Sequence, residues 1–295
     1  MRNFTNCLLI VVLIGGLPYA GFSYQKNSSA TSIMLLKGIV VDQENNNPLP
    51  YVSIGILNKP LGTLTDSTGH YQFEIGQENM QDNLQISMIG YVTQQILIAV
   101  LLNTTNEPIR MQRKITVLEE VLVSNKEYKN EVIGKQGSGK FIQISIHNKK
   151  SVEETIGSEM GMKFNTKRKN ALLKDFNWYL SGNNFNYIKF RVNVYSLKNG
   201  NPDSLLCKEQ IFATVENFKT GWFNIDLEPY HIKVNNDFLI TVQWVESKKE
   251  KLENPITLVP VSMTPFSKNC YVRIASQDKW KKMGVKLSDY ITVLY

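Results

Sequence analysis

The chain has 295 residues, of which 42% are hydrophobic, and its formal net charge is +7. This length is too great for one small domain and suits two domains of ordinary size. The charge is uneven: residues 31–123 hold five Lys and Arg against nine Asp and Glu, a net charge of −4, and residues 124–295 hold 26 against 17, a net charge of +9. After the N-terminal region no stretch is apolar enough to cross a bilayer; the longest, 96–102, has the length of a strand.

The first 23 residues have the layout of a secretory signal peptide. One early charge, Arg2, precedes an apolar stretch at 8–14, and small residues follow up to Ser23. The stretch is short and broken by glycine, which disfavours the alternative of a retained anchor. Cys7 lies at the start of the stretch rather than after the small residues, which argues against a lipoprotein. We expect residues 1–23 to be removed and the protein to be exported to the periplasm, the outer membrane or the cell surface.

Short β-type runs alternate with turn chemistry over residues 38–91. β-branched residues gather at 52–56, and apolar and polar residues alternate over 70–75, the period of a half-buried strand. The segments 45–48 and 66–69 are rich in Asn, Asp, Pro and Gly, which favour tight turns. The spacing predicts a small β-sandwich rather than βαβ units.

Two motifs in this region have a familiar form. Residues 62–73 read Gly-Thr-Leu-Thr-Asp-Ser-Thr-Gly-His-Tyr-Gln-Phe, and residues 89–91 read Ile-Gly-Tyr. Both resemble the carboxypeptidase-regulatory-like domain, a transthyretin-type (prealbumin-like) β-sandwich common in exported proteins of Bacteroidetes-type bacteria. The resemblance implies a domain over residues 35–124 that serves interaction or folding and is not catalytic by itself.

The next segment is charged and turn-rich, which predicts a linker over residues 125–140. Residues 118–123, Leu-Glu-Glu-Val-Leu-Val, resemble the segment that follows the same module in TonB-dependent receptors. Only about 170 residues follow, too few for a plug and a membrane barrel, and barrel strands are not apparent. A transporter is therefore not expected, and the role of residues 117–123 stays open, with contact to TonB as one hypothesis.

β-type alternation resumes at Phe141 and continues to the C-terminus, and no helix longer than two turns is indicated. We expect residues 141–295 to form a second, larger antiparallel sandwich, jelly-roll-like by strand count and spacing. The part from Gly221-Trp222-Phe223 onward resembles the C-terminal β-domain that follows this module in Bacteroidetes proteins. The predicted fold class is thus all-β, with two sandwich domains. The alternating positions are Phe176, Trp178, Leu180, Ile188, Phe190, Val192, Val194, Phe223, Ile225, Leu227, Phe238, Ile240, Val242, Trp244, Tyr271 and Arg273.

Residues 134–140, Gly-Lys-Gln-Gly-Ser-Gly-Lys, match the first seven positions of a phosphate-binding loop. The eighth position must offer a hydroxyl group to magnesium, and here it is Phe141. The loop must also lead into a helix, whereas residues 141–146 read as a strand. We therefore interpret the segment as part of the linker.

The histidines give no metal-binding pattern. A zinc carboxypeptidase needs a His-x-x-Glu pair, whereas the third residue after His70, His147 and His231 is Phe, Lys and Val, respectively. A nucleophile elbow is also absent from the sequence, and Cys207 and Cys270 lie in predicted strands. These two cysteines form either a disulfide or two buried thiols, and the sequence leaves both open.

The acidic residues do not form a catalytic or calcium-binding pattern. Asp66 supplies one carboxylate where a calcium loop needs several oxygen ligands, so a turn is expected there. Glu119-Glu120 and Glu153-Glu154 are adjacent pairs, and neighbours on a strand point to opposite faces. We predict no catalytic residue, no metal and no cofactor.

Aromatic and basic residues are the remaining resource for binding. Three tryptophans, Trp178, Trp222 and Trp244, are expected in the core, and Trp280, between two lysines, is the candidate for an exposed aromatic. The positive charge concentrates at Lys163, Lys167, Arg168, Lys169 and Lys174. This favours contact with anionic glycan or lipid, or describes a solvated loop, because no aromatic residue is interleaved there. Nucleic acid is at odds with export.

The sequence therefore favours a non-enzymatic exported envelope protein that acts as a binding or structural β-sandwich module, related to the N-terminal extension of TonB-dependent receptors. Its partner would be an envelope protein or glycan. The alternatives are a carbohydrate-binding accessory protein of the cell surface and a hydrolase with an unrecognised site. No site is visible in the sequence, and a fold alone does not give a function.

Overall fold

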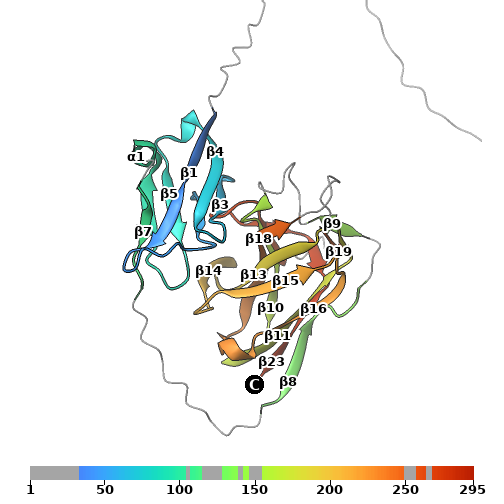
Figure 1. Ribbon diagram of the computed structural model, residues 1–295. Coiled ribbons are helices and arrows are strands. Elements are labelled where there is room, and N and C mark those ends of the chain that lie inside the picture. The colour runs from blue at the N-terminus through green and yellow to red at the C-terminus, as the bar shows by residue number, and fades with distance from the viewer. Residues whose placement is uncertain are drawn as a thin grey trace, which may run out of the picture. The chain divides into compact units, whose positions relative to one another are not determined.

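The computed structural model (Figure 1) describes residues 33–103, 107–114, 128–138, 142–145, 155–248, 257–263 (backbone only) and 268–295. Residues 32–295 form one compact unit. The expected signal peptide and the 117–123 segment lie outside the described residues. No helix in the described part is long and apolar enough to cross a membrane.

The N-terminal part forms two sheets that share one core. All pairings within them are antiparallel except that of β1 with β7. The core draws on both sheets, with Val40, Ile54, Leu84 and Met111 fully buried. One sheet has the order β4-β1-β7 and the other β3-β2-β5-β6. The elements are β1 (Ile33–Asp42), β2 (Ser53–Ile56), β3 (Gly62–Leu64), β4 (His70–Gly76), the 3-10 helix η1 (Gln77–Asn79), β5 (Asn83–Ser87), β6 (Gln94–Leu97), α1 (Ile98–Asn103) and β7 (Ile109–Met111).

The motif at residues 62–73 joins β3 to β4 through a tight turn. The Asp66 carboxylate accepts hydrogen bonds from the backbone N–H groups of Thr68 and His70, at 2.8 and 3.0 Å. Gly69 has a φ of +79°, a conformation that side chains with a Cβ rarely adopt. Asp66 thus closes a turn, as predicted.

The Ile-Gly-Tyr element, residues 89–91, is bonded to the end of β1. The Tyr91 hydroxyl donates to Asp42 Oδ2 at 2.8 Å, and Arg113 Nε donates to the same oxygen at 2.7 Å. Burial acts to raise the pKa of Asp42, but the bonds from Tyr91, the Glu44 N–H and Arg113 lower it to about 2. The buried carboxylate therefore stays ionised and joins three separate segments.

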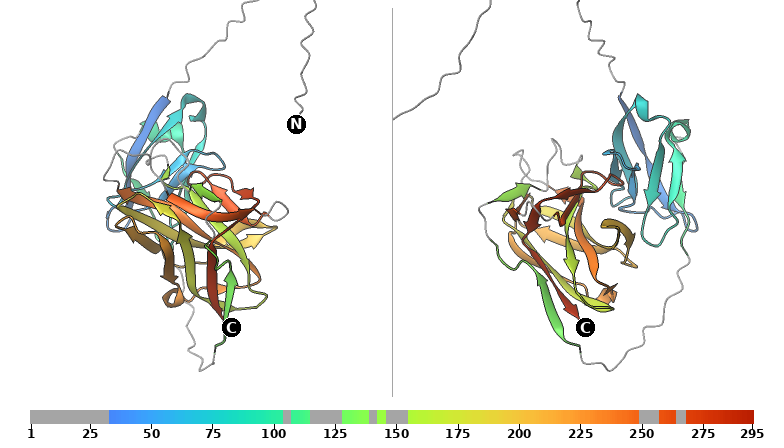
Figure 2. Two further views of the ribbon diagram at one scale, coloured as in Figure 1. Left: turned by 90° about the vertical axis from the view of Figure 1, so that its right-hand side faces the viewer. Right: turned by 180° about the vertical axis from the view of Figure 1, so that it is seen from behind.

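The C-terminal part consists of two larger sheets and one small sheet. The larger two lie as facing layers in Figures 1 and 2, with orders β14-β13-β18-β10-β20-β21, where β15 also pairs with β13, and β16-β11-β23-β8, where β17 also pairs with β11. The small sheet has the order β12-β19-β22, with β9 on β19. The elements are β8 (Asn130–Gly134), β9 (Gln143–Ser145), β10 (Glu159–Asn165), β11 (Ala171–Leu180), β12 (Gly182–Asn183), β13 (Tyr187–Lys198), β14 (Asn201–Leu205), β15 (Ile211–Glu216), β16 (Gly221–Asp226), the 3-10 helix η3 (Glu228–Tyr230), β17 (Lys233–Val234), β18 (Asp237–Lys248), β19 (Thr257–Met263), β20 (Cys270–Arg273), β21 (Lys281–Met283), β22 (Val285–Leu287) and β23 (Asp289–Leu294).

Alternating residues of the two larger sheets form the second core, so the all-β prediction and most of the predicted inward positions are confirmed. Trp178 and Trp244 lie on either side of Phe190, with ring centroids 5.1 and 5.4 Å away and edge-to-face geometry. Both tryptophans are nearly inaccessible to solvent. Such aromatic pairs prefer this geometry and each buries a large apolar area.

Three features differ from the sequence-based expectation. The predicted linker, 125–140, contains β8, which pairs with the C-terminal strand β23 as the edge of a sheet (Figure 1). β8 was missed because only alternate residues of this short edge strand are covered, so its polar composition reads as a loop. The apolar stretch 96–102 is strand only to Leu97 and then turns into α1. The third sheet is an addition to a two-sheet jelly roll.

One carboxyl group lies inside the second core and forms no ion pair with any residue that the structure describes. Asp289 opens β23 opposite Trp178 on β11 and is 1% exposed. Within the described residues, Asp289 Oδ2 and Trp178 Nε1 have no hydrogen-bond partner. Burial raises the pKa of Asp289 to about 8, against the opposing fields of Lys286 and Lys135. The folded protein therefore carries this group protonated at neutral pH.

This burial makes stability depend on pH. The folded carboxyl keeps its proton up to about pH 8, whereas the unfolded one loses it near 3.8. The contribution of Asp289 to the free energy of unfolding therefore falls as pH rises through this window, by at most about 1.4 kcal/mol per pH unit. Asp289→Asn should remove this dependence and stabilise the protein increasingly from pH 5 to pH 8. Urea unfolding of both proteins across this range measures it; a difference independent of pH would contradict the assignment.

Candidate functional site

A cluster of polar side chains is buried on one face of the seven-stranded sheet. Glu159 on β10 lies opposite Gln243 on β18 and Arg273 on β20, so their side chains share a face. Arg191 and Asn193 on β13 extend this face, because they pair with Gln243 and Thr241. Four neighbouring strands thus contribute to one cluster.

Glu159 is the centre of this cluster. Arg273 Nε donates to Glu159 Oε2 at 2.8 Å, and Arg273 Nη2 binds the same oxygen. Glu159 Oε1 accepts from Asn193 Nδ2 at 2.9 Å, from the Tyr195 hydroxyl at 3.1 Å and from the Thr241 hydroxyl. Both oxygens of the carboxylate are therefore fully engaged.

The electrostatics of the cluster favour an ionised carboxylate. Burial acts to raise the pKa of Glu159, but Arg273 and the bonds from Thr241 and Asn193 hold it below its usual value. Burial also acts to lower the pKa of Arg273, but the nearby Glu159 carboxylate raises it by more. The pKa of Arg273 is therefore above its usual value. A base with no free lone pair and a depressed pKa is poorly suited to proton transfer, so the geometry indicates a structural ion pair.

Arg191 connects this cluster to the first domain within the compact unit. It is 5% exposed and donates to Gln243 Oε1, to the backbone oxygen of Tyr51 at 2.9 Å and to Ser53 Oγ at 3.1 Å. Lys189 Nζ donates to the Tyr51 hydroxyl, which in turn donates to Glu246 at 2.8 Å. Burial lowers the pKa of Arg191, and its bonds to these oxygens compensate its removal from water.

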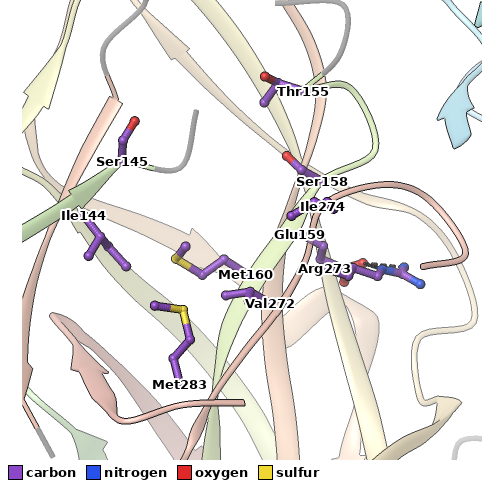
Figure 3. A pocket seen from close by; sticks show the side chains of 10 residues that line it. All are labelled: Ile144, Ser145, Thr155, Ser158, Glu159, Met160, Val272, Arg273, Ile274 and Met283. Atoms are coloured by element: carbon purple, nitrogen blue, oxygen red, sulfur yellow. Dashed lines mark hydrogen bonds and ion pairs between the residues drawn. The ribbon is translucent and has the colours of Figure 1, made fainter. Parts of the chain in front are cut away.

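A pocket lies beside the cluster, between β9, β10, β20 and β21 (Figure 3). Its volume is ≈ 320 Å³. In Figure 3 the head groups of Glu159 and Arg273 are joined to each other and point away from the space between Ile144, Met160 and Met283. The lining residues are Ile144, Ser145, Thr155, Ser158, Glu159, Met160, Val272, Arg273, Ile274 and Met283.

The two described histidines, His70 and His231, lie at turns. His70 Nδ1 and the Thr68 hydroxyl oxygen are hydrogen-bonded at a distance of 3.0 Å. His231 follows η3 and has a backbone φ of 48°. His147 lies outside the described residues, as do the pairs 119–120 and 153–154. No group of three metal-binding side chains occurs in the part of the chain that the structure describes.

Cys207 and Cys270 are free thiols, which decides between the two possibilities left by the sequence. Both lie in the core of the second sandwich. Burial raises the pKa of Cys207 to about 11 and that of Cys270 to about 12. Neither thiol is a thiolate at neutral pH, so neither is an activated nucleophile.

The resemblance to a phosphate-binding loop does not extend to the structure. Gly134 ends β8, and residues 135–138 are irregular. Residues 139–141 are outside the described part, and the chain then enters the strand β9 at Gln143. The predicted strand is confirmed for 143–145, so no helix N-terminus is available there for a phosphate.

The basic residues are divided between ion pairs and solvent. Lys163 binds Asp237 at 3.0 Å, and Arg168 binds Glu131 at 3.3 Å and lies over the Tyr295 ring. Lys167 and Lys169 are exposed in the β10–β11 connection, and Lys174 is half-buried on β11.

Two expectations for the tryptophans were wrong. Trp222 is not a core residue: it lies half-buried on the outward face of the five-stranded sheet, edge-to-face with Tyr179 and Tyr290 at 5.2 and 5.0 Å. Alternation alone did not reveal this, because Phe223 and Trp222 are both aromatic and only register assigns the face. Trp280 is half-buried against Tyr195 and Arg273, so it is not a free aromatic.

Sequence reasoning missed the buried charges Glu159, Arg191 and Arg273. A signal was present, because Arg191 stands between the apolar positions Phe190 and Val192 of a strand that proved long and central. Its partners, however, come from segments far apart in the chain, so the ionic cluster could not be assembled from local pattern.

Comparisons with known proteins identify the first domain. Residues 36–123 match the family model described as CarboxypepD_reg-like domain, so the chain contains a carboxypeptidase-regulatory-like domain. A search of curated proteins found no match.

Solved structures give only distant similarity. One covers the cysteine protease and lectin-like domains of Cwp84, a surface layer associated protein of Clostridium difficile, with a TM-score of 0.34, 10% identity, and coverage of 46% of this chain and 31% of that chain. Another is the clostridial cysteine protease Cwp84 after propeptide cleavage, with a TM-score of 0.37, 10% identity, and coverage of 56% and 40%. This chain covers less than half of either protein, and similarity at this level supports no inference about activity.

The Glu159 cluster predicts a large and specific loss of stability. Glu159→Gln leaves the Arg273 guanidinium buried without its ionic partner, which should lower the free energy of unfolding by about 3–5 kcal/mol. Glu74→Gln on the exposed side of β4 is the matched control, and a change within about 0.5 kcal/mol is expected for it. Urea unfolding compares the two. Equal effects would show that the ion pair does not hold the sheet.

Proposed function

We propose that this protein is a non-enzymatic exported envelope protein that acts through binding, with its regulatory-like domain as a structural module. One observation carries the proposal. The carboxylate of Glu159, which is buried beside the pocket, accepts hydrogen bonds from Arg273 and from three neutral donors. The high pKa values of the buried thiols Cys207 and Cys270 support it. Glu159 and Arg273 join neighbouring strands, and the two thiols pack in the core.

The sequence supports the proposed location of the protein, and exposed positive charge supports the proposed type of partner. The signal-peptide layout of residues 1–23 supports export to the periplasm or the cell surface. The relation to TonB-dependent receptors rests on the regulatory-like module and on residues 117–123. Lys167 and Lys169 are exposed members of the basic group and are the proposed contacts for anionic glycan or lipid headgroups.

Charge reversal at these two lysines tests the proposal. Binding to envelope polysaccharide or anionic vesicles should weaken as salt rises, because exposed charges are screened over about 8–10 Å at physiological ionic strength. Lys167→Glu with Lys169→Glu should weaken binding about ten-fold, whereas Lys37→Glu with Lys114→Glu, which changes the net charge equally, should not. Co-sedimentation measures both, beside a panel of peptidase and glycosidase substrates. Turnover that survives repurification, without salt-sensitive binding, would favour the hydrolase alternative.

A specific observation favours the second candidate, a carbohydrate-binding accessory protein. The half-buried rings of Tyr179, Trp222 and Tyr290 adjoin the amides of Asn177 and Asn224 on the outward face of the five-stranded sheet. Asn224 Nδ2 donates to Asn177 Oδ1 at 2.9 Å, and Asn224 is exposed. Aromatic faces beside planar donors and acceptors suit a sugar, which has an apolar face and a rim of hydroxyl groups.

Removal of the central ring tests this candidate. Trp222→Ala should lower affinity for a bound polysaccharide at least about ten-fold in affinity electrophoresis, as expected when a central aromatic contact is lost. Phe218→Ala, which removes an aromatic side chain that is 43% exposed in the connection between β15 and β16, should leave retardation unchanged. Equal retardation of all three proteins would reject a sugar site on this sheet.

A further inference from the structure

We propose that the pocket between β9, β10, β20 and β21 binds an uncharged aliphatic ligand that carries one hydroxyl or carbonyl oxygen. The volume of ≈ 320 Å³ lies at the lower end of the range for small-molecule sites, about 300–1,000 Å³. Protein interiors leave few voids larger than a water molecule, and an apolar cavity of about 150 Å³ already holds a benzene ring. The pocket therefore has room for a medium-length chain.

The walls of the pocket select for an apolar body. Ile144, Met160, Val272 and Met283 surround the space in Figure 3. Two of these four are methionines, whose unbranched and polarizable side chains adapt to ligands of irregular shape. An aliphatic chain would replace water against this surface, and that replacement is the main source of affinity.

The charges near the pocket do not serve a ligand. Glu159 and Arg273 bind each other, and their head groups point away from the space (Figure 3). A charged ligand would have to leave water without a partner of opposite charge among the described lining residues, which is unfavourable. The ligand is therefore uncharged.

Ser158 fixes the polar end of the ligand. Its side chain is 8% exposed, lines the pocket, and within the described residues its hydroxyl has no hydrogen-bond partner. In Figure 3 this hydroxyl points toward the side of the pocket on which Ser145 and Thr155 lie. A buried hydroxyl without a partner is costly, and an oxygen of the ligand would satisfy it.

Titration with 1-octanol, followed by NMR of methionine methyl groups, tests the proposal on the protein from residue 32 onward. The methyl resonances of Met160 and Met283 should shift and saturate, whereas that of Met111, buried in the core of the first domain, should stay unchanged. Octanoate, with the same chain and a charged head, should bind at least about ten-fold more weakly. Unsaturable shifts, or shifts at Met111 of the same size, would overturn the proposal.

Two variants assign the ends of the ligand. Ser158→Ala removes an unpaired hydroxyl, so it should leave the melting temperature unchanged or raised while affinity for 1-octanol falls about two- to ten-fold. Val272→Phe should fill the pocket and abolish the shifts of Met160 and Met283. Unchanged affinity in Ser158→Ala would overturn the assignment of the polar end, and retained shifts in a folded Val272→Phe would overturn that of the pocket.

Discussion

The buried ion pair between Glu159 and Arg273 joins β10 to β20 in the second sandwich. Separating two buried charges would leave each without its partner and its hydrogen bonds, at a large cost in free energy. The ion pair therefore fixes β10 and β20 relative to each other. A shift of one residue would turn Glu159 into the apolar core, because neighbours on a strand face opposite sides. The same alternation places Ser158, Met160 and Val272 at the pocket, beside the two charges but on the other face. The register that satisfies the ion pair therefore also builds the pocket.

This use of charge leaves Glu159 poorly suited to proton transfer. The Glu159 carboxylate accepts hydrogen bonds from four side chains, and burial raises the pKa values of the two thiols. The second sandwich also has a pocket lined by apolar residues and hydroxyl groups, and an outward sheet face with aromatic rings. Both are suited to non-covalent recognition. The contact of Arg191 with Tyr51 gives the regulatory-like domain a structural part in the same unit.

Residue types and local alternation were enough to predict the all-β fold. They did not predict the buried polar cluster around Glu159. The residue types of Gly69 and Asp66 alone predict their turn, and the alternation from Ile188 to Val194 predicts a buried strand. Arg191 lies inside that run, yet its partner Gln243 is 52 residues away, and no local rule supplies it. Likewise Trp222 and its neighbour Phe223 alternate equally well in either register, so the outward face could be assigned only from the pairing with Tyr179.

A pH titration of the Glu159 side-chain carboxyl carbon, followed by NMR in the folded protein, tests the account most directly. A carboxylate held by Arg273, Thr241 and Asn193 should remain ionised below the ordinary glutamate pKa of 4.5. Its protonation should then coincide with loss of the folded state at acid pH, because the contribution of the ion pair is present above the ordinary pKa and is lost below it. A carboxyl group that titrates above 4.5 in the intact fold, as a general acid or base would, contradicts a structural role and reopens catalysis at this site.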